Sequence, residues 1–128
     1  MPKLTQLTVS CQDRPGALAR LARLLGDAHI NILALLATAT VEGGFIGVVV
    51  DKPKLAKKAL DAAHMRYTEQ PVLHIELRNT PGALAGLAEK LAARAINITA
   101  AYETSVRGAK KASVVFAASD FEKAARIR

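Results

Sequence analysis

"DRPGALARLARLLGDAHINI" occupies residues 13–32, and "NTPGALAGLAEKLAARAINI" occupies residues 79–98. The two stretches align without a gap and are identical at eleven of twenty positions. Self-similarity at a fixed spacing indicates two copies of one structural unit. Each copy has roughly 60 residues, a size at which burial on folding gives only marginal stability. We therefore predict two mutually supporting units, residues 1–69 and residues 70–128.

The composition is that of an ordinary globular protein, with 51% hydrophobic and 23% charged residues. The sequence has no signal-peptide pattern and no bilayer-spanning run, and its single cysteine, Cys11, is typical of a reducing compartment. These features predict a soluble cytoplasmic protein without membrane partners. The net charge of +7 permits anionic partners, whereas a solvated basic surface is the alternative interpretation.

Hydrophobic periodicity in the first copy predicts the order strand, helix, strand, strand, helix, strand. Pro15 suits the first turn of the first helix, where its missing N–H loses no hydrogen bond. Asp51 is placed to cap the second helix, on which we expect Leu55, Ala59 and Ala62 to face inward. The predicted strands are 4–11, 31–41, 45–51 and 65–70, and the predicted helices are 15–28 and 53–64.

The strand predicted at 31–41 is apolar on both faces, and strands of this kind are covered on both sides. One face should meet the helices, and the other should pack against a second sheet in a homodimer. Strict alternation puts Ile32, Ala34 and Leu36 on one face and Leu33, Leu35 and Ala37 on the other.

The second copy repeats this order but stops early. Strands are predicted at 72–77, 97–106 and 111–118, with a helix from Pro81 and a capping box at 119–122 that opens a last helix. No room remains for a sixth element, so the second unit should lack its last strand unless a partner supplies one. The predicted fold is α+β: two ferredoxin-like βαββαβ units in tandem, each an antiparallel sheet with helices on one face.

The repeated Pro-Gly loop joins a strand to the start of a helix. The first amides of a helix have no internal partners and lie at the positive end of its dipole. Gly16 and Gly82 carry no side chain, so an outside carboxylate can approach these amides closely. Asp13 or Asn79 could bind the ammonium group of the same ligand. The alternative is a simple helix start, with Thr80 as an ordinary N-cap.

Asn31 and Asn97 recur between two isoleucines at the start of a strand. Asparagine is a poor strand residue, so its recurrence beside the recurring loop favours a role in ligand binding. The alternative is that each asparagine satisfies carbonyl groups left free at the end of the preceding helix.

Both copies resemble the ACT domain, a ligand-binding regulatory module of about this size. Its signature is an acidic or amide residue followed by x-Pro-Gly, an apolar helix, and Gly-Val/Ile-Asn-Ile at a strand start. The copies depart from it at His29 and Ala95, which stand where the signature has glycine. A helix that ends in the left-handed conformation prefers glycine there, and another residue costs ~1 kcal/mol.

The resemblance implies that two units pair side by side into an eight-stranded sheet and bind an amino acid at their junction. Asp13 would then work with Asn97, and Asn79 with Asn31. The two sites would differ, because one has a carboxylate where the other has an amide. The resemblance assigns the ligand-binding set Asp13, Arg14, Gly16, Ala17, Leu18, Asn31, Ile32, Asn79, Gly82, Ala83, Leu84, Asn97 and Ile98.

Other functions fit the sequence less well. Catalysis is not expected, because His29, His64 and His74 form no catalytic or metal-binding pattern, and no cofactor is expected. RNA binding is not expected either, because the strand at 45–51 offers only Phe45 for base stacking. A third possibility lies within the family: the chain is the regulatory subunit of a separate biosynthetic enzyme. The predicted function is a non-catalytic amino-acid sensor, with a free L-amino acid as ligand.

Overall fold

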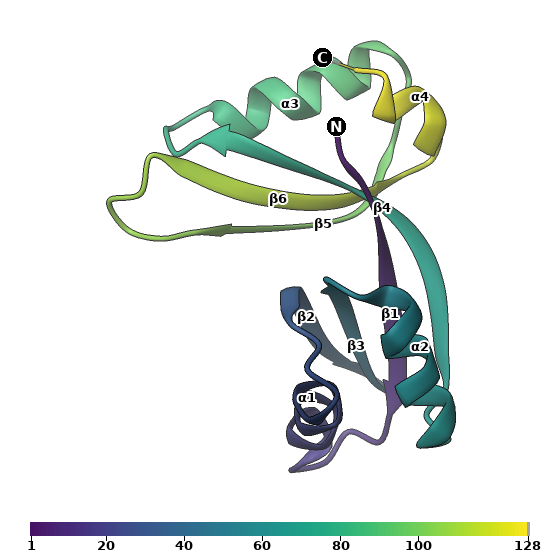
Figure 1. The fold of residues 1–128 in the computed structure, drawn as a ribbon. Helices are drawn as coiled ribbons and strands as arrows, with labels where there is room; N and C mark the ends of the chain where they lie inside the picture. The colour runs from purple at the N-terminus through teal and green to yellow at the C-terminus, as the bar shows by residue number, and fades with distance from the viewer. Residues whose placement is uncertain (128) are drawn as a thin grey trace. The chain divides into compact units, whose positions relative to one another are not determined.

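The computed structural model describes residues 1–127 and divides the chain into two compact units. The first unit comprises Thr5–Gln70. The second unit comprises Met1–Leu4 together with the chain from Pro71 onward. The first four residues therefore fold with the second copy of the repeat, although they precede the first copy in sequence (Figure 1).

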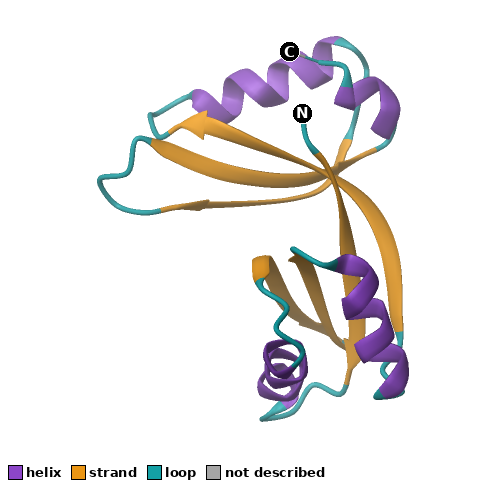
Figure 2. Cartoon of the chain, in the orientation of Figure 1, coloured by secondary structure: helices purple, strands orange, loops and turns teal. Residues whose placement is uncertain are grey.

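The first unit has two helices on one face of an antiparallel sheet, as predicted (Figure 2). Its strand order is β2-β3-β1-β4. Its core joins Leu7 and Val9 of the sheet to Leu21 and Leu25 of the first helix and Leu60 of the second. The elements are β1 (Lys3–Cys11), α1 (Ala17–Asp27), β2 (Ile32–Thr40), β3 (Gly43–Val50), α2 (Pro53–Ala62) and the first residues of β4 (Tyr67–Arg78).

The second unit repeats this arrangement with the strand order β1-β4-β6-β5. Leu73, Leu87, Leu91 and Phe116 form the centre of its core, and Ala124 and Ile127 close one side. Its further elements are α3 (Ala83–Ala93), β5 (Ile98–Ser105), β6 (Lys111–Ala118) and α4 (Phe121–Ala125).

Residues 1–4 occupy the strand position that the second copy lacks. The second copy has no strand after α4 in the described part of the chain, which confirms the prediction of a missing last strand. The backbone N–H of His74 donates to the carbonyl of Pro2 at 3.1 Å. Met1 packs against the second core, and Lys3 pairs with Glu122 at 3.1 Å. The N-terminal residues thus complete the second sheet by pairing with β4.

The two strands predicted at 65–70 and 72–77 are one continuous strand, β4. No turn residues interrupt the chain between them, and Pro71 is exposed on the strand. Proline fixes φ near a value that extended backbone accepts, and it only removes a donor, so it does not end the strand here.

A β-bulge in β2 overturns the predicted division of this strand into two faces. Ile32 lies opposite Val50 and Ala34 lies opposite Val49, so Leu33 is an additional residue. An extra residue moves every later side chain to the other face. Leu35 consequently lies opposite core residue Val48, whereas Leu36 lies on the other face with Ala34.

Two details of the predicted helices were also wrong. The inward residues of α2 are Ala56 and Leu60, whereas Leu55 is 42% exposed and Ala62 is also exposed. Ala59, the third predicted residue, is half-buried. In addition, α1 begins after Gly16, so Pro15 precedes the helix rather than standing in its first turn.

Three helices end in the same left-handed turn without glycine. His29, His64 and Ala95 have φ values of 58°, 56° and 56°. In each turn the next residue donates its N–H to the carbonyl five positions earlier, as Ile96 does to Leu91 at 3.0 Å. These are Schellman motifs, and the apolar pair at each one belongs to the core of its unit. The turns therefore form even though His29 and Ala95 replace the glycine of the signature, but each residue adopts a left-handed conformation that is unfavourable for it.

Replacing Ala95 by glycine should stabilise the protein by about 1 kcal/mol, because glycine adopts the left-handed conformation without the penalty of a Cβ. Urea unfolding would show a higher midpoint with an unchanged slope. The matched control is Ala92→Gly within the exposed face of α3, which should destabilise by a similar amount. A loss of stability in Ala95→Gly would contradict the strain assigned to this turn.

Deleting residues 1–4 behind a retained initiator methionine should expose the edge of β4. We expect the His74 amide to exchange its hydrogen about tenfold faster or more, because it loses its acceptor on Pro2. Amides of β3 should keep their protection, because their partners lie in the first unit. Lys3→Ala removes an exposed ion pair and a cation–π contact with Phe121 but no backbone bond to β4, so it should have little effect on this protection. Unchanged protection of His74 in the deletion variant would refute the assignment of residues 1–4 as the completing strand.

Candidate functional site

The Pro-Gly loop of the first unit is a compact turn that ends in a left-handed glycine. Arg14 donates its N–H to the carbonyl of Gln12 at 2.9 Å, and Ala17 donates to the carbonyl of Arg14 at 3.3 Å. Gly16 is the N-cap of α1, with φ 93° and ψ −12°. This conformation explains why the loop needs glycine, independently of any ligand.

The loop of the second unit has the same backbone. Thr80 donates to the carbonyl of Arg78 at 2.9 Å, and Ala83 donates to the carbonyl of Thr80 at 3.3 Å. Gly82 is the N-cap of α3, with φ 86° and ψ −9°. The alternative interpretation, in which Thr80 is an ordinary N-cap, does not hold, because Gly82 is the N-cap and Thr80 lies two residues before it.

Neither helix start receives a hydrogen bond from a capping side chain. By contrast, the carboxylate of Asp120 caps α4 by accepting from the N–H of Lys123 at 3.0 Å. A Cβ built on Gly16 or Gly82 would meet nothing within 4 Å, so both loops face open space. The amides of Ala17 and Ala83 are used within the turns, so the amides that follow them in the first turns of α1 and α3 are the ones that an outside anion could reach.

The two loops differ in the first residue of their motif. Asn79 is engaged: its side-chain amide donates to the carbonyl of Ala109 at 2.9 Å, and its backbone N–H donates to Lys110. These bonds tie the loop to the turn between β5 and β6. Asp13 is exposed, and among residues 1–127 no hydrogen bond or ion pair joins its carboxylate. The first loop therefore offers a free carboxylate where the second offers a committed amide.

A hollow of about 280 Å³ lies beside Asp13 in the first unit. The loop supplies Asp13 and Arg14, and the first turn of α1 supplies Ala17 and Leu18. The end of β2 and the start of β3 form the opposite wall. Five predicted residues of this unit thus lie at or beside one open site: Asp13, Arg14, Gly16, Ala17 and Leu18.

Asn31 and Asn97 hold equivalent places just before β2 and β5. The N–H of Asn31 donates to a carboxylate oxygen of Asp51 at 2.9 Å, and the N–H of Asp51 donates back to Asn31 at 3.1 Å. Asn97 makes the same reciprocal pair with Ser119, at 2.9 and 2.8 Å. Both asparagine side chains are exposed, and in the described chain no hydrogen bond engages them.

These pairs correct two predicted helix caps. Asp51 bonds Asn31 rather than capping α2, whose N-cap is Lys52. Ser119 bonds Asn97, and Asp120 caps α4 in its place. Asp51 and Ser119 can hold the strand start because each lies at the end of the neighbouring strand. Both residues fit the sequence pattern of a helix cap. In the structure, however, their side-chain oxygen atoms accept hydrogen bonds from the N–H groups of Asn31 and Asn97 instead.

Within one unit the structure does not bring the loop and the asparagine together. The loop precedes α1 and Asn31 follows it, and the eleven residues of this helix span about 16 Å. Ile32 and Ile98 pack against the cores, whereas Leu18 and Leu84 are 42% and 43% exposed. The pairing of a loop from one unit with an asparagine from another stays a prediction.

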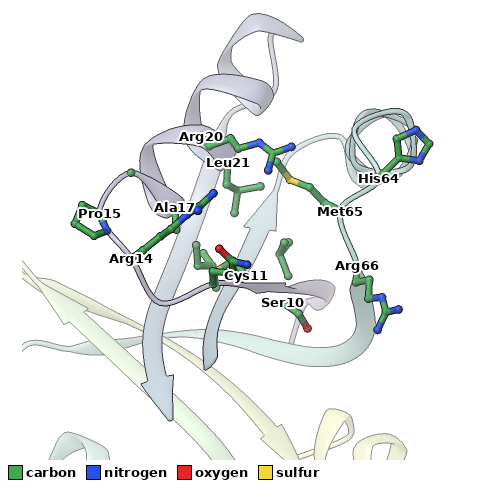
Figure 3. A pocket seen from close by; sticks show the side chains of 14 residues that line it. Ser10, Cys11, Arg14, Pro15, Ala17, Arg20, Leu21, His64, Met65 and Arg66 are labelled. Carbon is green, nitrogen blue, oxygen red and sulfur yellow. The ribbon is translucent and has the colours of Figure 1, made fainter. Parts of the chain in front are cut away.

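Sequence reasoning missed a larger cavity next to the first loop, which shares part of its lining with the hollow beside Asp13. It has a volume of about 1030 Å³ and lies between the start of α1, the end of β1 and the residues that follow α2 (Figure 3). Arg14, Arg20, His64 and Arg66 line it. Repeat comparison alone could not find it, because the motif shared by the two copies contains neither Arg14 nor Arg20.

Other chemistry is sparse in the described chain. Residues 1–127 contain no group of three or more His, Cys, Asp or Glu side chains that could hold a metal ion. In the same residues no helix is long and apolar enough to cross a membrane. Burial raises the pKa of the Tyr102 phenol. Burial also raises the pKa of Tyr67, and the hydrogen bond and charge of Asp61 add to this effect.

The fold and its two loops define a pair of ferredoxin-like modules. The family model for the ACT domain pair matches residues 2–127. The chain therefore belongs to the family of ACT domain pairs.

Solved structures agree with this assignment. Protein BT0572 from Bacteroides thetaiotaomicron is 28% identical, with a TM-score of 0.89, over 96% of this chain and 84% of that one. The regulatory subunit of aspartate kinase from Thermus thermophilus is 18% identical, with a TM-score of 0.71, over 98% and 94%. The corresponding subunit from Thermus flavus is 18% identical, with a TM-score of 0.65, over 88% and 81%. No curated protein matches the chain.

Proposed function

We propose that this chain is a non-catalytic regulatory module that binds a free L-amino acid at the Pro-Gly loop of the first unit. One observation carries the proposal: the exposed Asp13 carboxylate lies without a partner in the described chain, beside an uncapped helix start, at a hollow of about 280 Å³. An amino acid carries the two complementary charges. Its carboxylate suits the amides of α1, and its ammonium group suits Asp13.

The second loop is the weaker of the two candidates. Its helix start is equally open, but Asn79 holds the β5–β6 turn and lacks the charge that an ammonium group would favour. We therefore expect one bound amino acid per chain, because only the first loop has a carboxylate at the position of Asp13 and Asn79. Asn31 and Asn97 remain candidates for completing a site, because their side chains are free of the bonds that fix their backbone.

The alternative is that the chain is a regulatory subunit that associates with a separate enzyme. The structural neighbours include two regulatory subunits of aspartate kinase, which align with 98% and 88% of this chain. Such a module would act by a difference in ligand affinity between two states of the enzyme complex. Co-purification of a larger enzyme subunit with the tagged chain would favour this alternative over a free sensor.

A thermal-shift screen of the purified chain against the twenty L-amino acids tests the ligand class. Ligand that binds only the native state raises the melting temperature by mass action, and we expect a shift of several degrees with one or two of them. Asp13→Ala should lower the affinity for that amino acid about tenfold or more, because a charged hydrogen bond is lost. The matched control is Glu42→Ala, which removes an exposed carboxylate from the β2–β3 turn of the same unit.

Three results would decide the outcome. Loss of the shift in Asp13→Ala but not in Glu42→Ala supports the site. An equal response of both variants would assign the effect to net charge. A cooperative melt without a shift for any amino acid would refute the proposed ligand for the isolated chain. Asn31→Ala and Asn97→Ala extend the test, because neither variant removes a backbone bond of the fold.

We also infer that β2 mediates association with a second copy of the chain. It is the outer strand of the first unit, so its outer backbone groups lack a partner strand there. Leu33, Leu35 and Leu36 are 55%, 38% and 41% exposed along it. A long apolar edge of this kind is stabilised by pairing with another strand, and an identical strand provides a self-complementary surface.

The double variant Leu33→Lys with Leu36→Lys should weaken self-association at least tenfold, because charge and desolvation oppose burial of the edge. Sedimentation velocity over a concentration series would measure this change. Leu55→Lys on α2 is the matched control, since Leu55 is exposed to a similar degree but lies away from the edge. A wild-type chain that stays monomeric at high concentration would contradict the inference.

A further inference from the structure

The cavity of about 1030 Å³ in the first unit points to a second ligand site, which shares Arg14 and Ala17 with the hollow beside Asp13 but also includes Arg20, His64 and Arg66. We propose that it binds a small anion with two or more negative charges, of the organic phosphate class. Its lining includes three arginines from three segments: Arg14 from the loop, Arg20 from α1 and Arg66 from the residues just before β4. Figure 3 shows Arg20 extending from α1 toward Met65, with Arg14 and Arg66 on opposite sides.

The arginines of this cavity form no ion pair within the described chain, and the carboxylate of Asp61 lines a separate hollow together with Arg66. None of the residues that line it is an aspartate or a glutamate. Among residues 1–127 the ion pairs involve Lys3, Arg23 and Lys57, and none involves a lining arginine. Three arginines without counterions around one hollow create a local positive potential, which attracts a multiply charged anion.

The repeat provides an internal comparison for this charge. Arg14 and Arg20 correspond to Thr80 and Gly86 in the second copy, although the Pro-Gly motif around them is the same. The arginines are therefore not needed to form the loop or the helix. Arg14 and Arg20 are also exposed, so core packing does not explain them. A function restricted to the first unit accounts for this difference.

The composition of the wall favours phosphate over other anions. The guanidinium fork matches the oxygen spacing of phosphate and binds it in a bidentate manner. The floor is apolar, with Leu21 and Ile46, which suits the organic part of a small molecule. No Phe, Tyr or Trp lines the cavity, so it lacks the stacking surface by which single-stranded nucleic acid is bound.

Isothermal titration calorimetry of the full chain with inorganic pyrophosphate, at constant ionic strength, tests the proposal. Arg20→Gln and Arg66→Gln should each weaken binding about tenfold or more, because each removes a charge-assisted hydrogen bond. The matched control is Arg23→Gln. Arg23 lies on the same helix and loses the same charge, but it pairs with Asp27 and lies outside the cavity. The control should bind pyrophosphate within twofold of the wild type.

Further arms separate the sources of an effect. Citrate at equal charge distinguishes phosphate from polycarboxylate, and tighter binding of citrate would overturn the phosphate class. A short RNA that binds more tightly than pyrophosphate, with equal loss in all three arginine variants, would assign the charge to a general basic surface. Absence of pyrophosphate binding at millimolar concentration would refute the site. The amino-acid shift should persist in Arg20→Gln and Arg66→Gln, so the two sites succeed or fail independently.

Discussion

The backbone pairing of β1 is the constraint on which both units depend. From Gln6 onward this strand pairs with β3 inside the first sheet, while the residues before Thr5 pair with β4 of the second unit. The second copy of the repeat has only five of the six elements of its fold in the described chain, so the edge of β4 would otherwise lack a partner. The two units are thus tied by a shared strand, and a cut between the repeats would not yield two complete modules.

Much of this fold could be predicted because the repeat and the periodicity are local signals. The order of elements, the two open helix starts and the apolar stripe with Leu21 and Leu25 follow from spacing alone. The failures involved non-local pairing. Asp51 and Ser119 carried the pattern of helix caps, but each bonds an asparagine at the start of a neighbouring strand. Local propensity cannot show which of two acceptable partners a short polar side chain will meet.

The bulges in β2 and β5 show the same limit on sequence reasoning. Register shifts occur between Ile32 and Ala34 and between Ile98 and Ala100, directly after the two asparagines. The sequence shows that asparagine is an unusual residue for a strand start. It does not show that the strand carries an extra residue shortly after it. Since bulges re-aim side chains and concentrate near functional sites, their presence in both copies agrees with a special role for these strand starts. The candidate site could be predicted by residue identity, although its geometry depends on this irregular register.

Comparison of the two copies separates what the fold requires from what it does not. The left-handed turns explain Gly16 and Gly82, and burial explains the paired leucines and isoleucines. The identical asparagines have no such explanation, because their side chains neither pack in a core nor bond within the described chain. Positions at which the two copies differ show, in contrast, which side chains the fold does not require.

Asp13 aligns with Asn79 and Arg20 aligns with Gly86, yet the loops and helices of the two copies have the same geometry. The fold therefore does not depend on the charge at these positions, and this charge can differ between the two units. The first loop carries an exposed carboxylate and an arginine without an ion pair in the described chain, whereas the second loop uses its amide to hold the β5–β6 turn. This difference in charge is the reason why the proposed ligand site is assigned to the first unit rather than to the second.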